Sequence, residues 1–338
     1  MDRKISRWIL WIAVLLIALL GVSAVSLCVG SAGIPFRKII SLLLEGRGSA
    51  EYSILLDIRL PRILLGFAIG GSLSLAGVIL QGMFRNPLVE PYTLGISGAA
   101  ALGVCINIVL RLYRFLGLIS LPVFGFLGAI IVIAVIYSLS LRKGILRMQG
   151  LLLTGVMFSF ISSSLIMLIM AVSHTRDLHG IVFWVMGSLQ EPDWFLIKAM
   201  SYVSITLLFV SYFFSLDLNA LSLGEEEAQH LGINVERTKK LLFAIASLLT
   251  AFSVSVAGII GFVGLVVPHF VRMFAGSDHR ILLVASFLSG AAFLIFCDTL
   301  SRTIIAPMEL PVGVITGILG GSLFIYALTK RKAVLGAR

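Results

Sequence analysis

Charged side chains are scarce in this sequence. Asp, Glu, Lys and Arg make up 12% of its 338 residues, whereas 59% are hydrophobic and the mean hydropathy is +1.08. A soluble domain carries about 25% charged residues, so this shortage excludes a water-soluble domain. The sequence predicts a multi-pass protein of the lipid bilayer, with a single transmembrane domain over residues 1–338.

Cysteine is also rare. The three cysteines, Cys28, Cys105 and Cys297, each lie inside an apolar run, which suits neither a disulfide framework nor a zinc site. We therefore expect no bound metal and no cofactor. The formal net charge of +10 comes from short basic clusters between apolar runs. Such clusters are typical of membrane topology signals, and we expect no nucleic-acid partner.

The motifs of enzymes and of ion-coupled carriers are missing as well. There is no GxSxG, no HExxH and no Asp pair at membrane depth, and no GxxxxGK[ST] nucleotide-binding loop. If ATP drives this protein, another chain must bind it. Ion-coupled carriers usually keep carboxylates or histidines inside the membrane. Here Asp298 and Lys198 lie near the ends of apolar runs and Glu309 lies in a loop, which disfavours ion coupling.

Long apolar runs predict an all-α fold. Each is near the ~20 residues that a helix needs to cross ~30 Å of hydrocarbon. The run from Leu241 to Ala275 is long enough to cross once or to fold back, which gives nine or ten helices. The other runs are Trp8–Val29, Ile63–Phe84, Tyr92–Leu110, Leu118–Leu141, Leu151–Val172, Phe195–Leu216, Ile281–Leu300 and Val312–Leu328.

The positive-inside rule favours ten transmembrane helices. With a cytoplasmic N-terminus, ten crossings place 16 of the 26 Lys and Arg inside, whereas nine leave 11 inside and 15 outside. The chain would reverse near Gly258, Gly261 and Gly264, and both termini would be cytoplasmic. The basic residues placed inside are Arg3, Lys4, Arg7, Arg85, Arg142, Lys143, Arg147, Arg237, Lys239, Lys240, Arg272, Arg280, Lys330, Arg331, Lys332 and Arg338.

A repeated motif supports this topology. Ser72-Leu-Ser-Leu-Ala-Gly77 resembles Ser253-Val-Ser-Val-Ala-Gly258, and a proline follows each glycine at the same spacing, at Pro87 and Pro268. Five crossings separate the copies, so they would run in opposite directions, as in inverted-repeat transporters. The sequence predicts that helices 2–5 and 7–10 form this repeat. Close packing of small residues is the alternative explanation.

A polar segment, residues 217–240, would lie on the cytoplasmic side between the sixth and seventh helices. Gly224 and Gly232 bracket a short helix with acids, including Glu225, in its first turn, as helix N-termini favour. Ala228 and Leu231 are three residues apart and would share one apolar face. From the residues alone, this helix could dock on a partner, or rest on lipid or on its own bundle.

Taken together, these residues resemble the FecCD-type permeases, the membrane subunits of ABC importers for ferric siderophores, haem and cobalamin. The resemblance runs from about Arg59 to Leu328, and the order and combination of its motifs are specific. Five stretches carry it: RLPR at Arg59–Arg62, QGMFRNPLVEPYTLG at Gln81–Gly95, LGEEEAQHLG at Leu223–Gly232, GFVGLVVPHFVR at Gly261–Arg272 with DHR at Asp278–Arg280, and ELPVGVITG at Glu309–Gly317.

The resemblance implies the type II ABC importer permease fold, with ten helices per subunit. It also implies a homodimer or a paired permease, two cytoplasmic ATP-binding subunits and an extracytoplasmic substrate-binding protein, in the cytoplasmic (inner) membrane of a prokaryote. In that family the segment matching Leu223–Gly232 couples the permease to the ATPase. The resemblance therefore assigns ATPase coupling to Gly224, Glu225, Ala228, Leu231 and Gly232.

The resemblance also suggests a role for Arg59, Arg62 and Arg302, which the predicted topology places at the outer face. Arginines that match these three meet glutamates of the binding protein in the family, and a dimer would present six around one entrance. Exposed pairs of arginine and carboxylate contribute about 0–1 kcal/mol each. Their main effect would therefore be steering and register. Snorkelling of arginines at a helix end is the alternative explanation.

A large chelate needs a wide and weakly binding pathway, because tight binding would stall its release. The predicted fifth helix carries hydroxyl groups and no charge, and the tenth carries two overlapping GxxxG steps. The family places both helices beside the central channel, with a cytoplasmic gate just before the fifth; helix packing is the alternative explanation at each position. The predicted pathway residues are Met148, Gln149, Ser159, Ser162, Ser163, Gly313, Gly317 and Gly321.

The sequence thus predicts a permease subunit with no enzymatic activity of its own, in an ATP-driven importer whose expected cargo is a ferric siderophore. Haem and cobalamin-like corrinoids are alternative cargoes for the same architecture. An ion-coupled secondary transporter is the alternative from a different class.

Overall fold

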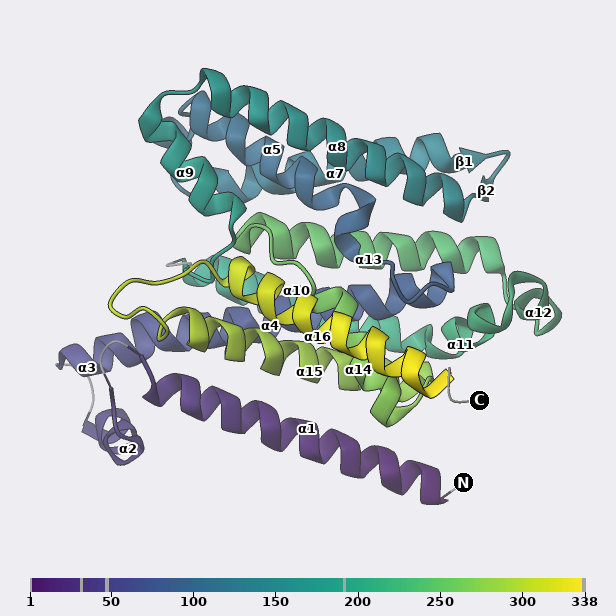
Figure 1. Ribbon diagram of the computed structural model, residues 1–338, viewed down its shortest axis with the longest axis horizontal. Coiled ribbons are helices and arrows are strands. Elements are labelled where there is room, and N and C mark those ends of the chain that lie inside the picture. Colours follow the sequence, from purple (N-terminus) through teal and green to yellow (C-terminus); the bar gives the residue numbers. More distant parts are fainter. Residues whose placement is uncertain (1, 31–32, 46–48, 191–192, 336–338) are drawn as a thin grey trace.

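The computed structural model describes residues 2–30, 33–45, 49–190 and 193–335, and Arg338 lies outside the described residues. The described chain forms a helical bundle with a small β-hairpin (Figure 1). Its elements are α1 (Asp2–Cys28), α2 (Phe36–Glu45), α3 (Ala50–Ser53), the π-helical turn η1 (Ile54–Arg59), α4 (Leu60–Phe84), the 3-10 turn η2 (Pro91–Leu94), α5 (Ile96–Val109), α6 (Tyr113–Leu116), α7 (Ser120–Ser140), β1 (Leu141–Arg142), β2 (Ile145–Leu146), α8 (Met148–Val172), α9 (Thr175–Val185), α10 (Trp194–Phe213), α11 (Ser215–Leu223), α12 (Glu225–His230), α13 (Val235–Ala257), α14 (Val263–Ala275), α15 (His279–Ser301) and α16 (Val312–Leu335).

The expected all-α membrane fold is confirmed. In the described part of the chain, seven helical segments are long and apolar enough to cross a membrane: Lys4–Cys28, Ala50–Phe84, Ser120–Ser140, Met148–Val172, Trp194–Phe213, Val235–Ala257 and His279–Ser301. Three shorter apolar helices cover Ile96–Val109, Val263–Ala275 and Val312–Ala327. These segments coincide with the ten predicted helices, while the number of complete crossings stays a prediction.

The segments expected on the cytoplasmic side share one end of the bundle. The start of α1, the β-hairpin, α12 and the end of α16 all lie on the right in Figure 1. At this end Lys4 donates a 3.0 Å hydrogen bond to Asp278, between α14 and α15. At the opposite end Arg302 donates to the hydroxyl of Ser26 at 2.8 Å. The arrangement agrees with an even number of passes, and the membrane side of each end stays a prediction.

The long apolar run is broken in two, as its glycines predict. Helix α13 ends at Ala257, and after a short connection α14 begins at Val263 and runs back (Figure 1). Gly258 has φ +72°, a conformation that side chains with a Cβ rarely adopt. A Cβ there would also lie 2.1 Å from the carbonyl oxygen of Trp184. Because it lacks a Cβ, Gly258 allows both the sharp turn after α13 and the close contact with the end of α9.

The two copies of the repeated motif differ in local structure. Ser72–Gly77 lies in the middle of α4, which continues to Phe84, whereas Ser253–Gly258 ends α13. As a result Pro87 falls in a connection and Pro268 falls inside α14. Helices α4 and α13 do run in opposite directions (Figure 1). The duplication itself stays a prediction, because the matched prolines occupy different structures.

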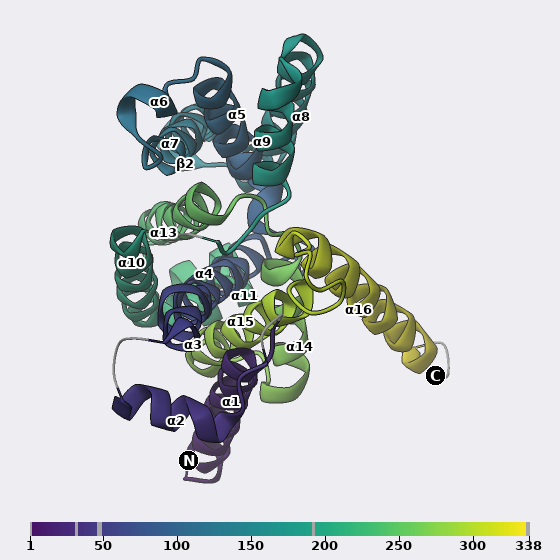
Figure 2. The same ribbon diagram turned by 90° about the vertical axis from the view of Figure 1, so that its left-hand side faces the viewer.

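Helix α4 lies at the centre of the bundle, in contact with α10, α13, α14 and α15 (Figure 2). Two glycines bring its backbone against its neighbours. A Cβ on Gly70 would lie 2.3 Å from the carbonyl oxygen of Gly290 on α15, and a Cβ on Gly77 would lie 1.9 Å from that of Gly264 on α14. Close contact through small residues is how membrane helices gain packing. Helices α8 and α16 instead lie at the edge of the bundle, on one side (Figure 2).

Candidate functional site

The start of α4 and the end of α15, at the end of the bundle opposite α12, hold a cluster of buried charges. Arg62 on α4 is 6% exposed and donates to Glu309 at 2.7 Å, while its other guanidinium nitrogen lies 4.0 Å from Asp298 on α15. One turn after Asp298, the side chain of Arg302 lies 3.0 Å from the same carboxylate. Asp298 therefore sits between two guanidinium groups, which compensates part of the cost of burying each charge.

Arg59 and Arg302 also hold the end of α1. Arg59 donates to the backbone carbonyl of Leu27, and Arg302 donates to the hydroxyl of Ser26. Carbonyls in the last turn of a helix have no partner within the helix, so Arg59 satisfies one of them. Both arginines are almost completely buried.

The predicted docking residues Arg59, Arg62 and Arg302 thus lie together, and all three are buried within the described chain. Asp298 and Glu309 pair with Arg62, Asp298 also pairs with Arg302, and Arg59 and Arg302 bond the end of α1. Snorkelling toward an interface does not describe them, because their partners are inside the chain. Docking stays a prediction, and a partner carboxylate would have to compete with Glu309 for Arg62.

Glu309 joins several segments at this end. It accepts from Arg62 and from the side-chain amide of Gln190, between α9 and α10, and its own segment leads into α16. Burial by itself would raise the pKa of Glu309, but the hydrogen bond and the charge of Arg62 outweigh burial and hold this pKa below its ordinary value. Glu309 is therefore ionised, with a side chain that is still 36% exposed.

The predicted pathway hydroxyls on α8 differ in their surroundings. Ser163 is exposed and Ser159 is half-buried. Ser162 is 2% exposed, and a Cβ added to Gly98 of α5 would lie 3.1 Å from the Cβ of Ser162. Ser162 therefore packs α8 against α5, and only Ser159 and Ser163 offer surface to a pathway. The predicted gate residues Met148, half-buried, and Gln149, exposed, begin α8 just after the β-hairpin.

The predicted pathway glycines on α16 also differ. A Cβ on Gly313 would lie 2.3 Å from the carbonyl oxygen of Met186, so Gly313 allows close packing on the end of α9. A Cβ on Gly321 would lie 3.6 Å from the ring of Phe262, an ordinary contact. At Gly317 a Cβ would meet nothing within 4 Å. Gly317 is therefore the glycine of this set that leaves α16 open, and its place in a pathway stays a prediction.

The expected helix in the polar segment forms as α12. It begins after Gly224 and ends in a turn in which the N–H of Ile233 bonds the carbonyl of Ala228, and the N–H of Gly232 bonds that of Gln229. This is the Schellman pattern, and Gly232 supplies the required left-handed conformation at φ +84°. The two glycines thus bracket the helix as predicted.

The prediction that Ala228 and Leu231 share one apolar face of α12 is wrong. Ala228 is completely buried against its own chain, whereas Leu231 is 65% exposed. The helix ends at His230, so Leu231 is already part of the terminating turn. Leu231 remains available to a partner and Ala228 does not, while the coupling role of the segment stays a prediction.

Lys239, on the first turns of α13, joins α12 to the β-hairpin. Its ammonium group lies 3.0 Å from Glu225 on α12 and 2.5 Å from Glu236, and it donates to the carbonyl of Leu146 in β2 at 3.3 Å. Glu236 in turn accepts the backbone N–H of Leu146 at 2.7 Å. Lys239 is 2% exposed. Lys239 and Glu236 together bond both the carbonyl and the N–H of Leu146, which lies two residues before the start of α8.

Sequence reasoning missed the roles of two ionisable residues, Lys239 and Glu90. Lys239 was counted only as a topology signal, although a lysine one turn after Glu236 could have suggested an ion pair. Glu90 was not noticed, although it lies in a proline-bounded connection, and the structure makes it a half-buried acceptor for the backbone N–H of Phe262 just before α14. Next to it, the hydroxyl of Tyr92 accepts the N–H of Ile260 at 3.0 Å. Glu90 and Tyr92 thus satisfy backbone groups where the chain breaks between α13 and α14.

Comparison with known proteins gives consistent matches along the chain. The sequence model described as the FecCD transport family matches residues 14–330. The hemin transport system permease protein HmuU of Yersinia pestis is 38% identical over 325 residues, which cover 96% of each chain. The cobalamin import system permease protein BtuC of Halobacterium salinarum is 40% identical over 275 residues, covering 81% of this chain and 73% of that one. An inward-facing structure described as that of a metal-chelate type ABC transporter superposes with a TM-score of 0.82 at 30% identity, covering 94% of this chain and 98% of the other.

Proposed function

The chain belongs to the FecCD transport family of ABC importer permeases for metal chelates, and from this premise we propose that it carries a ferric siderophore across a prokaryotic inner membrane. It acts as a homodimer or paired permease with two separate cytoplasmic ATP-binding subunits and an extracytoplasmic binding protein. Both termini and the segment 217–240 face the cytoplasm. Haem and cobalamin-like corrinoids are the alternative cargoes.

The observation that carries the ATP-driven part of this proposal is the bonded link from α12 to the start of α8. Glu225 on α12 pairs with Lys239, and Lys239 donates to Leu146, two residues before Met148. A displacement of α12 by an ATP-binding subunit would reach α8 through these bonds, because coupling travels through contiguous bonded contacts. Coupling through Gly224, Glu225, Ala228, Leu231 and Gly232 then acts by the position of α12, with Leu231 as the exposed contact.

The surfaces of α8 and α16 support a polar, oxygen-rich cargo. Ser159 and Ser163 present hydroxyl groups on α8, and Gly317 leaves α16 open. Hydroxyl groups form neutral hydrogen bonds of about 0.5–1.5 kcal/mol net, which a chelate can exchange as it moves. A pathway of this kind favours passage over tight binding. Recognition of the individual chelate is left to the binding protein.

The outer arginine cluster supports docking in a modified form. Arg62 already holds a carboxylate, that of Glu309, at 2.7 Å. A glutamate of the binding protein would exchange with Glu309, and Arg59 and Arg302 would keep the end of α1 in place during the exchange. Charge-assisted pairs of this kind give register and orientation to a complex.

Reconstitution tests the proposal. The full chain is placed in proteoliposomes with its ATP-binding subunit and its binding protein, and radioactive ferric siderophore, haem and cobalamin are offered separately. We expect ATP-dependent accumulation of the siderophore, with no uptake when either partner is left out. Transport of haem or cobalamin instead would contradict the proposed siderophore cargo and leave the proposed importer mechanism in place. Accumulation by the permease alone under an ion gradient would refute the importer mechanism itself.

A further inference from the structure

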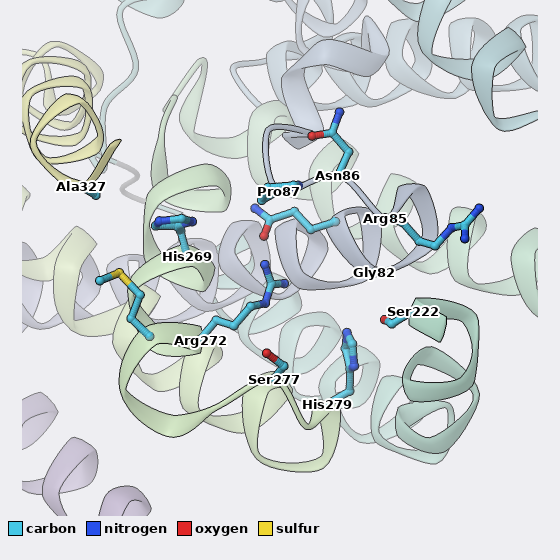
Figure 3. Close-up of a pocket in the computed structure, with 12 residues that line it drawn as sticks. Gly82, Arg85, Asn86, Pro87, Ser222, His269, Arg272, Ser277, His279 and Ala327 are labelled. Carbon is cyan, nitrogen blue, oxygen red and sulfur yellow. The ribbon is translucent and has the colours of Figure 1, made fainter. Parts of the chain in front are cut away.

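A cavity of about 670 Å³ lies where α4, α11, α14, α15 and α16 come together (Figure 3). It is at the end of the bundle that also holds α12 and the start of α1. Among the described residues that line it there is no carboxylate, whereas four side chains carry or can carry positive charge: Arg85, His269, Arg272 and His279.

Arg272 occupies the middle of this cavity. Figure 3 shows its guanidinium group between His269 on one side and His279 on the other. No described carboxylate pairs with it. The nearby Asp278 is already engaged by Arg280 at 2.8 Å. A guanidinium group stays charged at any physiological pH, and a half-buried charge without a counter-ion is costly. Arg272 therefore needs an anion that the described chain does not supply.

His279 presents a second unused group to the cavity. Its Nδ1 lies 2.8 Å from the side-chain oxygen of Asn219, and that oxygen also accepts the backbone N–H of His279. The Asn219 oxygen is thus an acceptor and Nδ1 carries the hydrogen. The opposite nitrogen, Nε2, is buried without a partner among the described atoms. A Cβ on Gly82 would lie 2.9 Å from Nε2, so the glycine keeps this face of the ring open.

Gln81 adds an unused acceptor to the same cavity. Its amide nitrogen donates to the carbonyl of Gly264 at 3.2 Å, while its amide oxygen is buried and receives no hydrogen bond from the described residues. A fitting ligand must therefore bring anionic oxygens for Arg272 and hydroxyl hydrogens for His279 Nε2 and the Gln81 amide oxygen. An ionised carboxylate supplies the first and lacks the second.

We propose that this cavity binds a phosphate group that carries or adjoins a hydroxyl group. Arginine matches phosphate geometry with two parallel hydrogen bonds, so Arg272 holds two of the oxygens. With its hydrogen on Nδ1, His279 accepts at Nε2, so hydroxyl groups of the ligand donate to Nε2 and to the amide oxygen of Gln81. A soluble phosphate or the headgroup of phosphatidylglycerol can supply this chemistry. The proposal does not depend on which chelate the protein transports.

The test uses the full chain purified in detergent without added lipid. Binding of radioactive inorganic phosphate is measured by equilibrium dialysis, and binding of phosphatidylglycerol is compared with that of phosphatidylcholine by native mass spectrometry. We expect saturable binding of phosphate, of phosphatidylglycerol or of both, with phosphatidylcholine excluded. Binding of phosphate alone identifies a soluble source, and binding of phosphatidylglycerol alone identifies a lipid source.

Two variants and a control separate a built site from general attraction to a basic protein. Arg272→Gln should weaken binding about ten- to hundredfold, as expected for loss of hydrogen bonds to a charged group. Without ligand it should unfold at the same or a higher temperature than the wild type, because an uncompensated charge is removed. Ser277→Glu, at the exposed rim, should place a carboxylate near Arg272 and also weaken binding. Arg142→Gln, exposed on β1 at the same end, should change nothing.

Two results would overturn the proposal. One is that neither phosphate nor phosphatidylglycerol binds the wild type. The other is that Arg272→Gln and Arg142→Gln bind the probes as tightly as the wild type. Because Ser277→Glu changes a surface residue, it keeps the test informative even if Arg272→Gln fails to fold.

Discussion

The ammonium group of Lys239 lies 3.0 Å from the carboxylate of Glu225, and the two side chains differ sharply in exposure. Lys239 is 2% exposed, while the side chain of Glu225 is 43% exposed. Neutralising Glu225 would leave Lys239 paired with Glu236 at 2.5 Å. Removing Lys239 instead frees both acids and the carbonyl of Leu146. The buried lysine is therefore the common point of the link between α12 and α8.

Replacing Lys239 with methionine should uncouple the transporter. The change keeps an unbranched side chain of nearly the same length and removes its charge, so α12 is no longer bonded to Leu146. We expect a loss of about 1–3 kcal/mol of stability, less than for a completely buried pair because the two acids can reach water. ATP-driven uptake should fall at least tenfold, whereas ATP hydrolysis by the complex should persist.

The matched control for this variant is Lys240→Met, one residue along the same helix. It removes the same charge from the same end and leaves the bonds to Glu225 and Leu146 intact. Uptake and apparent unfolding temperature of both variants are measured in parallel. Equal effects of Lys239→Met and Lys240→Met would mean that net charge matters and the link does not.

Glu309→Gln should lower stability in a pH-dependent way. The pKa of Glu309 lies below its ordinary value, so its contribution is present above the unfolded pKa of about 4.3 and is lost as pH falls through the folded value. At pH 7 the variant should unfold at a lower temperature than the wild type, and the difference should narrow below about pH 4.3. A difference that stays constant from pH 7 to pH 3 would contradict the assignment.

The docking arginines are best tested by neutral replacements. Reversal to glutamate would place new carboxylates beside Asp298, which already lies 3.0 Å from Arg302, and would disturb the outer end of the bundle. Arg62→Gln should weaken binding-protein affinity by up to about fivefold, as expected for about 0–1 kcal/mol per pair. Its residual binding should depend less on salt. Glu309→Gln should have the opposite effect on affinity, because it leaves Arg62 free.

Binding is measured with the immobilised full-length permease at two salt concentrations. Unchanged affinity in both Arg62→Gln and Glu309→Gln would show that the outer cluster only holds the bundle together. Arg59→Gln provides a comparison, because Arg59 bonds the end of α1 at Leu27. It should act more on stability than on affinity.

Features set by neighbouring residues could be predicted from the sequence, and features set by distant ones could not. The break at Gly258 and the bracketing of α12 by Gly224 and Gly232 follow from local backbone preferences. The burial of Arg62 depends on Glu309, 247 residues away, and no local pattern indicates that pairing. The same holds for Lys239, whose bond to Leu146 spans 93 residues. Exposure of charged side chains was accordingly the least predictable property.

Gly70→Ala should destabilise the bundle, and Gly317→Ala should not. A Cβ at Gly70 would lie 2.3 Å from a backbone oxygen of α15, whereas one at Gly317 would meet nothing within 4 Å. Forcing an atom into a packed contact typically costs about 1–3 kcal/mol. Both sites are helical glycines, so alanine's better helix propensity acts equally on the two. The apparent unfolding temperature in detergent compares them, and equal values would contradict the close crossing of α4 and α15.

Replacing Gly317 with a larger residue tests whether this part of α16 lines the transport pathway or is only an open surface. Tryptophan at this position has room within the isolated chain, since the neighbouring space is open, so Gly317→Trp should leave the unfolding temperature of the purified subunit unchanged. If Gly317 faces the cargo, the ring should narrow the passage and reduce ATP-driven uptake at least tenfold, while ATP hydrolysis continues. Ile318→Trp is the control, because this next residue is already large and 62% exposed. Normal uptake by Gly317→Trp would remove α16 from the pathway at this depth, and loss of uptake in both variants would point instead to a general effect of bulk on the face of α16.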